Sequence, residues 1–249
     1  IISDEGNSTI KLSWVVPILV FPVFGTLFYL FLTLQPGTHR INRRIEEVGT
    51  KLRPYLLQDP EVLAHYESIS ASGGNLVRYM NQYGRFPAYE NTGVRYFPLG
   101  DDMFPVLLEE LKKAEHFIFM EYFIVEHGVM WDAILQVLET KAAEGVEVRF
   151  MYDGMGNLFT LPHGYEKAMQ EKGIQCKIFA PVRPALSSYQ NNRDHRKICV
   201  IDGHTAFTGG VNLADEYINQ RVRFGHWKDT AVMLKGKAVD SFTMMFLQL

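Results

Sequence analysis

Hydrophobic and polar residues follow three patterns along the chain, and each pattern predicts a different kind of element. No charged residue occurs from Leu12 to Leu34. Residues 39–69 mix apolar, acidic and basic side chains in a helix-forming composition, and Ser70–Gly74 marks a break. From Val94 onward, short apolar runs alternate with amphipathic ones. We predict four segments: residues 1–11 outside a membrane or between helices, a transmembrane helix over 12–36, a helical linker over 37–92 and an α/β domain over 93–249.

The uncharged run is long enough, as a helix, to cross the roughly 30 Å apolar layer of a bilayer. A signal peptide is the alternative, but the run exceeds the usual apolar region of such peptides and lacks a small-residue cleavage site. Pro17, Pro22 and Gly25 are tolerated in such a helix and can kink it. Five basic residues follow within 20 residues, whereas Asp4 and Glu5 precede the run, so the positive-inside rule places the domain in the cytoplasm.

The remaining pattern is strand, helix, strand, helix, strand. The predicted strands are Val94–Phe97, Phe117–Val125, Val146–Tyr152 and Ile174–Phe179, and the predicted helices are Phe104–Ala114, Met130–Ala143 and Tyr165–Lys172. This order predicts a sheet with helices packed on its faces. We assign the aromatic side chains of Phe117, Phe119, Tyr122 and Phe123 to its core.

Composition narrows the classes of protein to which the chain can belong. The net charge of −3 argues against a protein that grips nucleic acid along its whole surface. Cys176 and Cys199 lie far apart in apolar runs, which indicates buried thiols in a reducing compartment. The histidines show no spacing typical of a metal site, so we predict no metal ion and no cofactor.

One stretch carries most of the chemistry. His195 and Lys197 lie two residues apart, so in an extended chain they share one face while Arg196 points to the other. Ile198–Ile201 predicts a buried strand that closes at the Asp202-Gly203 turn, and a second strand over Thr205–Thr208 stops at Gly209-Gly210. His195 and Asn212 are then expected at the ends of adjacent strands. The loop over 180–192 is expected to border a substrate cleft.

These side chains suit the cleavage of a phosphodiester. A neutral imidazole can attack phosphorus and form a covalent intermediate, while Lys197 and the Asn212 amide offset the charge that grows in the transition state. No metal is required for this chemistry.

Structural explanations also exist. Asp202 before Gly203 is explained by the turn itself, which favours a structural role over direct chemistry, and Asn212 could cap the helix that contains Asp215 and Glu216. A lone His-x-Lys is common. The joint occurrence of His-x-Lys-x-x-x-x-Asp with Gly-Gly-x-Asn at close range favours a functional site.

The run resembles the HKD motif of the phospholipase D superfamily, and its surroundings resemble bacterial cardiolipin synthases. The similar blocks are Glu121–Ile124, Lys141–Arg149, Tyr152–Gly154, Asn192–Lys197, Gly209–Asn212, Asp215–Tyr217 and Trp227–Thr230. The resemblance implies a phospholipase D-like mixed sheet with flanking helices. It makes His195 the nucleophile, with Lys197 and Asp202 completing the catalytic motif. It further implies that Lys197, Gly209, Gly210 and Asn212 bind substrate phosphate and that Asp229 or Glu216 orients the imidazole.

Members of that superfamily carry two such motifs, and this chain has one complete His-x-Lys-x-x-x-x-Asp motif. The chain starts at Ile1 and stops at Leu249 inside an amphipathic run, so we interpret it as a fragment. On this interpretation the second histidine, the general acid, lies in a missing C-terminal half. The alternative is a homodimer that pairs two single motifs across a two-fold axis.

The expected function is a cardiolipin synthase in the bacterial plasma membrane. It would transfer a phosphatidyl group between two phosphatidylglycerol molecules through a phosphohistidine, giving cardiolipin and glycerol. The expected partners are phosphatidylglycerol and other membrane phospholipids, with no nucleic acid. The alternatives are a membrane-anchored phospholipase D-type hydrolase or nuclease, and a non-catalytic lipid-binding half.

Overall fold

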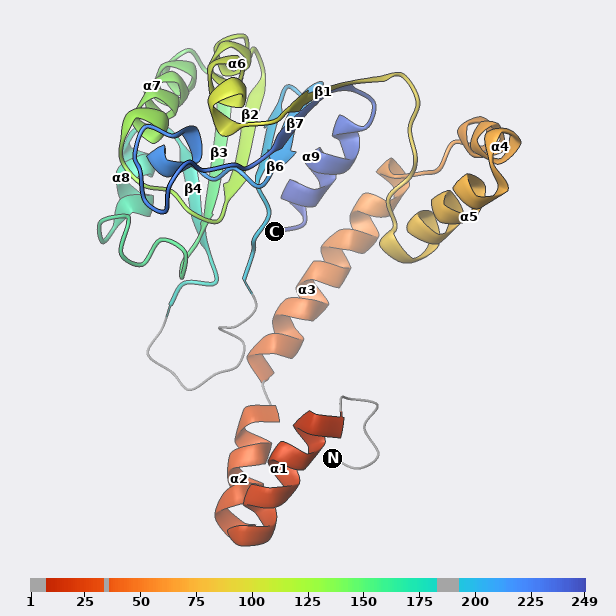
Figure 1. Cartoon of the computed structure of the whole chain (residues 1–249), viewed down its shortest axis with the longest axis vertical. Helices are drawn as coiled ribbons and strands as arrows, with labels where there is room; N and C mark the ends of the chain where they lie inside the picture. Colours follow the sequence, from red (N-terminus) through yellow and green to blue (C-terminus); the bar gives the residue numbers. More distant parts are fainter. Residues whose placement is uncertain (1–7, 34–35, 183–192) are drawn as a thin grey trace. The chain divides into compact units, whose positions relative to one another are not determined.

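The computed structural model describes residues 8–33, 36–182 and 193–249 of the chain. Two compact units divide the chain between Glu46 and Glu47, and each is described by itself. The first unit contains α1 (Ser8–Val20), α2 (Pro22–Thr33) and the beginning of α3 (Pro36–Leu52). Helices α1 and α2 lie side by side, with the Trp14 ring 5.9 Å from that of Phe28 and 5.4 Å from that of Tyr29 (Figure 1).

The predicted single helix over residues 12–36 is therefore wrong, because two helices occupy this stretch. Pro22 has no N–H to donate to the preceding turn, so the first helix ends at Val20 and Pro22 starts the second. Gly25 lies so close to α1 that an added Cβ would come within 2.7 Å of the Pro17 carbonyl oxygen. Across the described residues, neither these two helices nor any other combines the length and hydrophobicity that a bilayer crossing requires.

The second unit begins with further helices. They are the end of α3, the 3₁₀ turn η1 (Arg53–Tyr55), α4 (Pro60–Ile69), α5 (Ala71–Tyr79) and the π turn η2 (Met80–Gly84). Ser70 both ends α4 and caps α5, where its hydroxyl oxygen accepts the Gly73 N–H at 3.2 Å. The predicted break at residues 70–74 is thus the single residue Ser70, and both glycines lie inside α5.

A seven-stranded mixed sheet forms the centre of this unit. Its strands are β1 (Thr92–Phe97), β2 (Phe117–Tyr122), β3 (Glu147–Asp153), β4 (Gln175–Phe179), β5 (Ile198–Ile201), β6 (Thr205–Gly209) and β7 (Ala231–Gly236). Their spatial order is β1-β7-β6-β5-β2-β3-β4. Strands β2, β3 and β4 are parallel to their neighbours in this group, and every other pairing is antiparallel. The predicted mixed sheet is confirmed, although β2 ends at Tyr122 instead of Val125.

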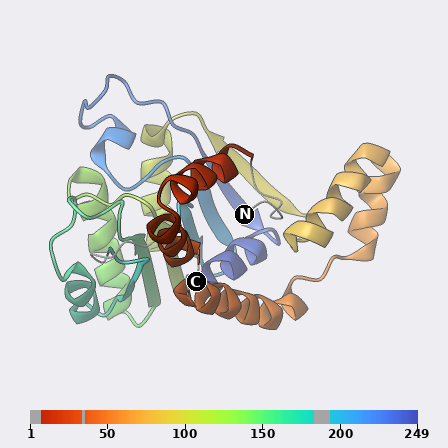
Figure 2. The ribbon, with the colours of Figure 1, turned by 90° about the horizontal axis from the view of Figure 1, so that it is seen from below.

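Helices cover both faces of the sheet. Figures 1 and 2 show α6 (Gly100–Lys112), α7 (Val129–Ala143) and α8 (Tyr165–Glu171) on one side and α9 (Val239–Leu247) on the other. Alternate strand residues supply the two cores, because neighbouring side chains point to opposite faces. Ile118 and Met120 of β2 enter the larger core with α6 and α7, whereas Phe119 packs with Phe246 of α9. Both cysteines are buried free thiols, as predicted.

The sheet topology brings four loops to one edge. Strand β5 runs antiparallel to both β2 and β6, so the segment before β5 lies beside the residues that follow β2 and β6. Strand β7 is antiparallel to β6, which adds the segment before β7. The predicted site residues lie in these segments or, in the case of Gly209, at the end of β6. Asp202 is the exception, because it follows β5 and lies at the opposite edge.

Candidate active site

His195 and Lys197 lie against the same aromatic ring. The His195 ring is 4.7 Å from that of Phe123, and the Lys197 Nζ is 5.3 Å from the centre of the Phe123 ring. The Lys197 ammonium also donates to the His195 carbonyl oxygen at 2.7 Å. The predicted shared face is therefore confirmed, although residues 193–197 precede strand β5 instead of belonging to it.

The two side chains differ in exposure. His195 is exposed, and its ring makes no hydrogen bond to any residue in the described part of the chain. Lys197 is only 4% exposed. Burial lowers the pKa of Lys197 to about 8, against the opposing influence of Asp194 and Asp229. The site thus combines a solvent-accessible imidazole with a desolvated cation.

Arg196 points to the opposite face, where two carboxyl groups share it. The Arg196 Nε lies 2.7 Å from the Glu121 Oε1 and 3.0 Å from the Asp194 Oδ1. Glu121 is 1% exposed, and its two oxygens make no hydrogen bond that meets normal geometry among the described residues. Burial and the neighbouring Asp194 raise the pKa of Glu121 to about 9, although Arg196 opposes the shift. One guanidinium does not offset two buried carboxylates, so Glu121 retains its proton at neutral pH.

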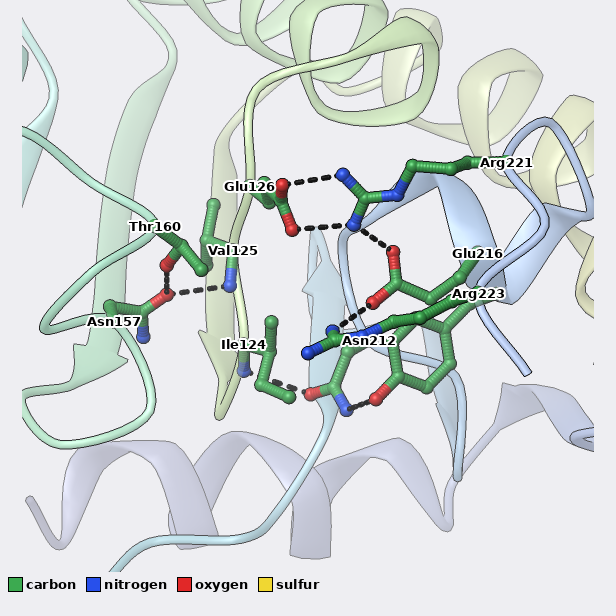
Figure 3. Close-up of polar contacts among 10 residues, drawn as sticks. Ile124, Val125, Glu126, Asn157, Thr160, Asn212, Glu216, Arg221 and Arg223 are labelled. Carbon is green, nitrogen blue, oxygen red and sulfur yellow. Dashed lines mark hydrogen bonds and ion pairs between the residues drawn. The ribbon is translucent and has the colours of Figure 1, made fainter.

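Asn212 connects the strand ends beside the site. Its Oδ1 accepts the Ile124 N–H at 3.0 Å, and its Nδ2 donates to the Tyr217 hydroxyl at 2.9 Å (Figure 3). The side chain is buried. These bonds fix the course of the chain after β2. The structure thus gives Asn212 a structural role, while phosphate binding by its amide stays a prediction.

Gly209 and Gly210 allow close approach of the segment before β7. An added Cβ on Gly209 would come within 2.3 Å of the Thr230 carbonyl oxygen, and one on Gly210 within 1.8 Å of the Asp229 Oδ1. Asp229 Oδ1 also accepts the Thr230 N–H at 2.9 Å. The glycine pair therefore places the Asp229 carboxylate over the backbone at this edge, where its charge acts on Lys197.

The two predicted orienting carboxylates have different surroundings. Glu216 is buried and pairs with Arg221 at 2.6 Å and Arg223 at 2.9 Å (Figure 3). Glu216 therefore forms ion pairs with two arginines, and it makes no hydrogen bond to His195 in the described part of the chain. Asp229 makes no bond to His195 there either, but it lies near Lys197 and stays the candidate.

Asp202 lies at the far end of the sheet from His195. Its carboxylate accepts the backbone N–H groups of Glu115, His116 and Phe117, each at 2.8 Å. These residues precede β2 or start it, whereas Phe123 follows it, so about 20 Å of strand separates the two ends. The structural role is the one that this geometry supports, and the structure does not bring Asp202 to the catalytic group.

Several residues of the site had no clear signal in the sequence. The sequence pattern assigns Phe123 to the core, but its side chain is only partly buried and lines the site. Glu121 and Asp194 were not expected to share Arg196, because only the pairing of β2 with β5 brings them together. The predicted cleft-bordering loop falls mainly on residues 183–192, which lie outside the described residues.

Comparison with known proteins identifies similar sequences over the whole chain. Residues 107–240 match the family described as cardiolipin synthase, PLD-like domain, and residues 1–32 match phospholipase D-nuclease N-terminal. An uncharacterized protein of Streptococcus mutans is 47% identical over 249 residues, covering 100% of this chain and 54% of that protein. A cardiolipin synthase of Alkalihalophilus pseudofirmus is 34% identical, covering 98% of this chain and 49% of that protein. The chain therefore spans about half the length of these relatives.

A solved structure is also similar. NucT from Helicobacter pylori aligns with a TM-score of 0.48 and 14% sequence identity, covering 64% of this chain and 94% of that chain.

Proposed function

Because the chain belongs to the phospholipase D-like domain family of cardiolipin synthases, we propose that it supplies the nucleophilic half of a phosphatidyltransferase active site. The observation that carries the proposal is the exposed His195 imidazole beside the buried Lys197 cation on one aromatic ring. An exposed imidazole can reach a phosphodiester, and a desolvated cation attracts its anionic oxygens more strongly than one in water.

In the proposed reaction, a His195 ring nitrogen attacks the phosphorus of one phosphatidylglycerol. The bond from phosphorus to the glycerol oxygen breaks, and the departing glycerol takes a proton from a general acid. That acid is proposed to be a second histidine, from the rest of the protein or from a second copy. The hydroxyl of another phosphatidylglycerol then gives its proton to the same general acid, now deprotonated. Its oxygen bonds to phosphorus as the phosphorus–nitrogen bond breaks, releasing cardiolipin and the free imidazole.

The buried Lys197 and the Asn212 amide are proposed to bind the phosphate oxygens, with the Gly209-Gly210 backbone beside them. Asp229 is proposed to orient the imidazole when substrate is bound. A place at the bacterial membrane, with the catalytic domain on the cytoplasmic side, belongs to the same proposal. The membrane location is supported by the large apolar side chains that α1 and α2 expose, among them Leu19 and Val23. The cytoplasmic side is supported by the basic residues that follow the apolar run.

The test uses the full-length protein in phosphatidylglycerol liposomes, with cardiolipin and free glycerol followed by mass spectrometry. Both products should appear in equal amounts, and His195→Ala should abolish both. His204→Ala is the matched control, because this exposed histidine lies beyond Asp202, in the turn between β5 and β6. Phosphatidic acid without cardiolipin would indicate a hydrolase, and unchanged turnover by His195→Ala would remove His195 from the mechanism.

A further inference from the structure

Two loops at the site edge expose large apolar side chains. In the loop after β3, Phe159 is 94% exposed and Leu158 is also exposed. In the loop before β7, Val222 is 80% and Phe224 is 79% exposed. Leaving such side chains in water forgoes the stabilisation that burial would give. Their presence in two separate loops therefore needs an explanation.

Both loops are fixed to the same short segment after β2. On one side, Asn157 Oδ1 accepts the Val125 N–H at 2.6 Å, and its Nδ2 donates to the Phe123 carbonyl oxygen at 2.7 Å. On the other side, Arg221 forms a bidentate pair with Glu126, at 2.6 and 2.8 Å. Figure 3 shows these groups reaching residues 124–126 from opposite sides. Both loops are thus anchored within three residues of Phe123, against which His195 lies.

The polar anchors also decide which side chains point outward. Arg221 and Arg223 both bind the buried Glu216, and the residue between them, Val222, is left exposed. Phe224 follows with its ring under the Arg223 guanidinium, 5.4 Å from the ring centre. Asn157 is buried in the same way, and the next two residues are exposed. The exposure therefore follows from specific hydrogen bonds and ion pairs.

The charges around these side chains favour an anionic lipid surface. Residues 154–164 and 219–228 contain no Asp or Glu, and their charged residues are Arg221, Arg223 and Lys228. Glu126 and Glu216 offset part of the charge of the two arginines, but both guanidinium-bearing side chains stay partly exposed, and Lys228 is exposed with no ion pair among the described residues. Exposed aromatic and aliphatic side chains beside basic ones are typical of segments that enter the interface of a membrane with anionic headgroups.

We propose that the two loop tips, Leu158 with Phe159 and Val222 with Phe224, insert into the lipid layer and hold the His195 site at the membrane surface. The choice of lipid rests on the proposed function. Insertion would place the imidazole at the level of the lipid phosphates, so the substrate need not leave the bilayer to react.

The test places an environment-sensitive fluorophore on each of the two loop tips, in the variants Phe159→Cys and Phe224→Cys. Cys176 and Cys199 are buried, so labelling is selective for the new thiol. Lys112→Cys is the matched control, because Lys112 is exposed and ends α6 beside the start of β2, at the other edge of the sheet. All variants carry His195→Ala, so that no turnover occurs.

With vesicles of equal parts phosphatidylglycerol and phosphatidylcholine, both tip labels should shift to the blue and be quenched by a quencher on the lipid chains. The label at position 112 should not change. Unquenched tip labels on vesicle-bound chain would overturn the proposal, as would labels in the full-length protein that are already buried before vesicles are added. This readout needs no catalysis, so it fails or succeeds independently of the proposed reaction.

A second measurement addresses turnover. In the full-length protein, Phe159→Ser combined with Phe224→Ser should lower the ratio of turnover on vesicles to turnover on dissolved short-chain phosphatidylglycerol by about tenfold. The ratio corrects for any loss of folded protein. An unchanged ratio would contradict the role of the tips in reaching the bilayer.

Discussion

Arg196 Nε lies 2.7 Å from Glu121 Oε1, on the face of the chain opposite to the one that His195 and Lys197 share. Asp194 binds the same guanidinium at 3.0 Å. The residues immediately before and after His195 are therefore both held by one buried cluster. Since the cluster tethers the backbone on either side of the imidazole, it limits the movement of His195 although the ring itself is exposed.

This cluster predicts a pH-dependent stability. The pKa of Glu121 is raised to about 9 in the folded chain, whereas a glutamate in an unfolded chain has a pKa of about 4.3. Between these values the folded chain binds more protons, so this group makes the free energy of unfolding fall as pH rises from 5 to 9. Urea unfolding at several pH values should show a smaller fall for Glu121→Gln. Glu147→Gln, in a partly exposed pair with Arg149, is the control and should keep the original slope.

Asp202→Ala should reduce stability strongly and activity little. The substitution removes three bonds from backbone N–H groups to a carboxylate, and it puts alanine at a φ of 51°. We expect a loss of roughly 3 kcal/mol in the free energy of unfolding. Turnover per folded molecule should stay near that of the unaltered protein, measured beside chemical denaturation. A large loss of turnover in folded protein would contradict this prediction and indicate that Asp202 has a catalytic role.

The same carboxylate predicts a loss of stability in acid. Burial opposes ionisation of Asp202, but three backbone N–H groups outweigh it and lower the pKa in the folded chain. The carboxylate therefore contributes fully to the free energy of unfolding above the unfolded-chain pKa of about 3.9. This contribution is lost as pH falls through the lower pKa of the folded chain. In the Asp202→Asn variant, the free energy of unfolding measured by urea denaturation should depend less on pH in this range.

Lys197 predicts an alkaline limit to activity. Burial lowers its pKa to about 8, so its charge is lost as pH rises through that value. The kcat/KM of the full-length protein should fall above about pH 8. Lys197→Arg should be slower, because a planar guanidinium cannot replace a compact ammonium, but it should lose this alkaline fall since arginine stays charged. An unchanged fall in that variant would assign it to another group.

Asn212 has two possible contributions that a matched pair separates. Tyr217→Phe removes one hydrogen-bond partner of the Asn212 amide and leaves the bond to Ile124 intact. Asn212→Ala removes both bonds and should cost roughly 2 kcal/mol of unfolding free energy, because the Ile124 N–H loses its partner. If Asn212 also binds phosphate, only Asn212→Ala should lower kcat/KM by more than about tenfold in folded protein. Equal effects of the two substitutions would indicate a structural role alone.

The sequence by itself determined the features that depend on local periodicity. Alternation placed His195 and Lys197 on one face and Arg196 on the other, and short apolar runs located β5 and β6 with their turn at Asp202-Gly203. These predictions succeeded because side-chain direction in an extended chain, and the backbone needs of a turn, are set within a few residues. The apolar run after residue 11 was also evident, but its periodicity could not distinguish one long helix from two helices separated before Pro22.

Only the tertiary structure decided which of the motif residues meet. Asp202 accepts hydrogen bonds from residues that lie 85–87 positions away in the sequence. Glu216 forms ion pairs with Arg221 and Arg223. Glu121 contacts Arg196 because β2 pairs with β5. Strand order determines these contacts, and it is chosen by the burial of all seven strands and their helices together. No local run of residues contains that information, so side chains of the same chemical type can be catalytic candidates or structural anchors according to the edge of the sheet they reach.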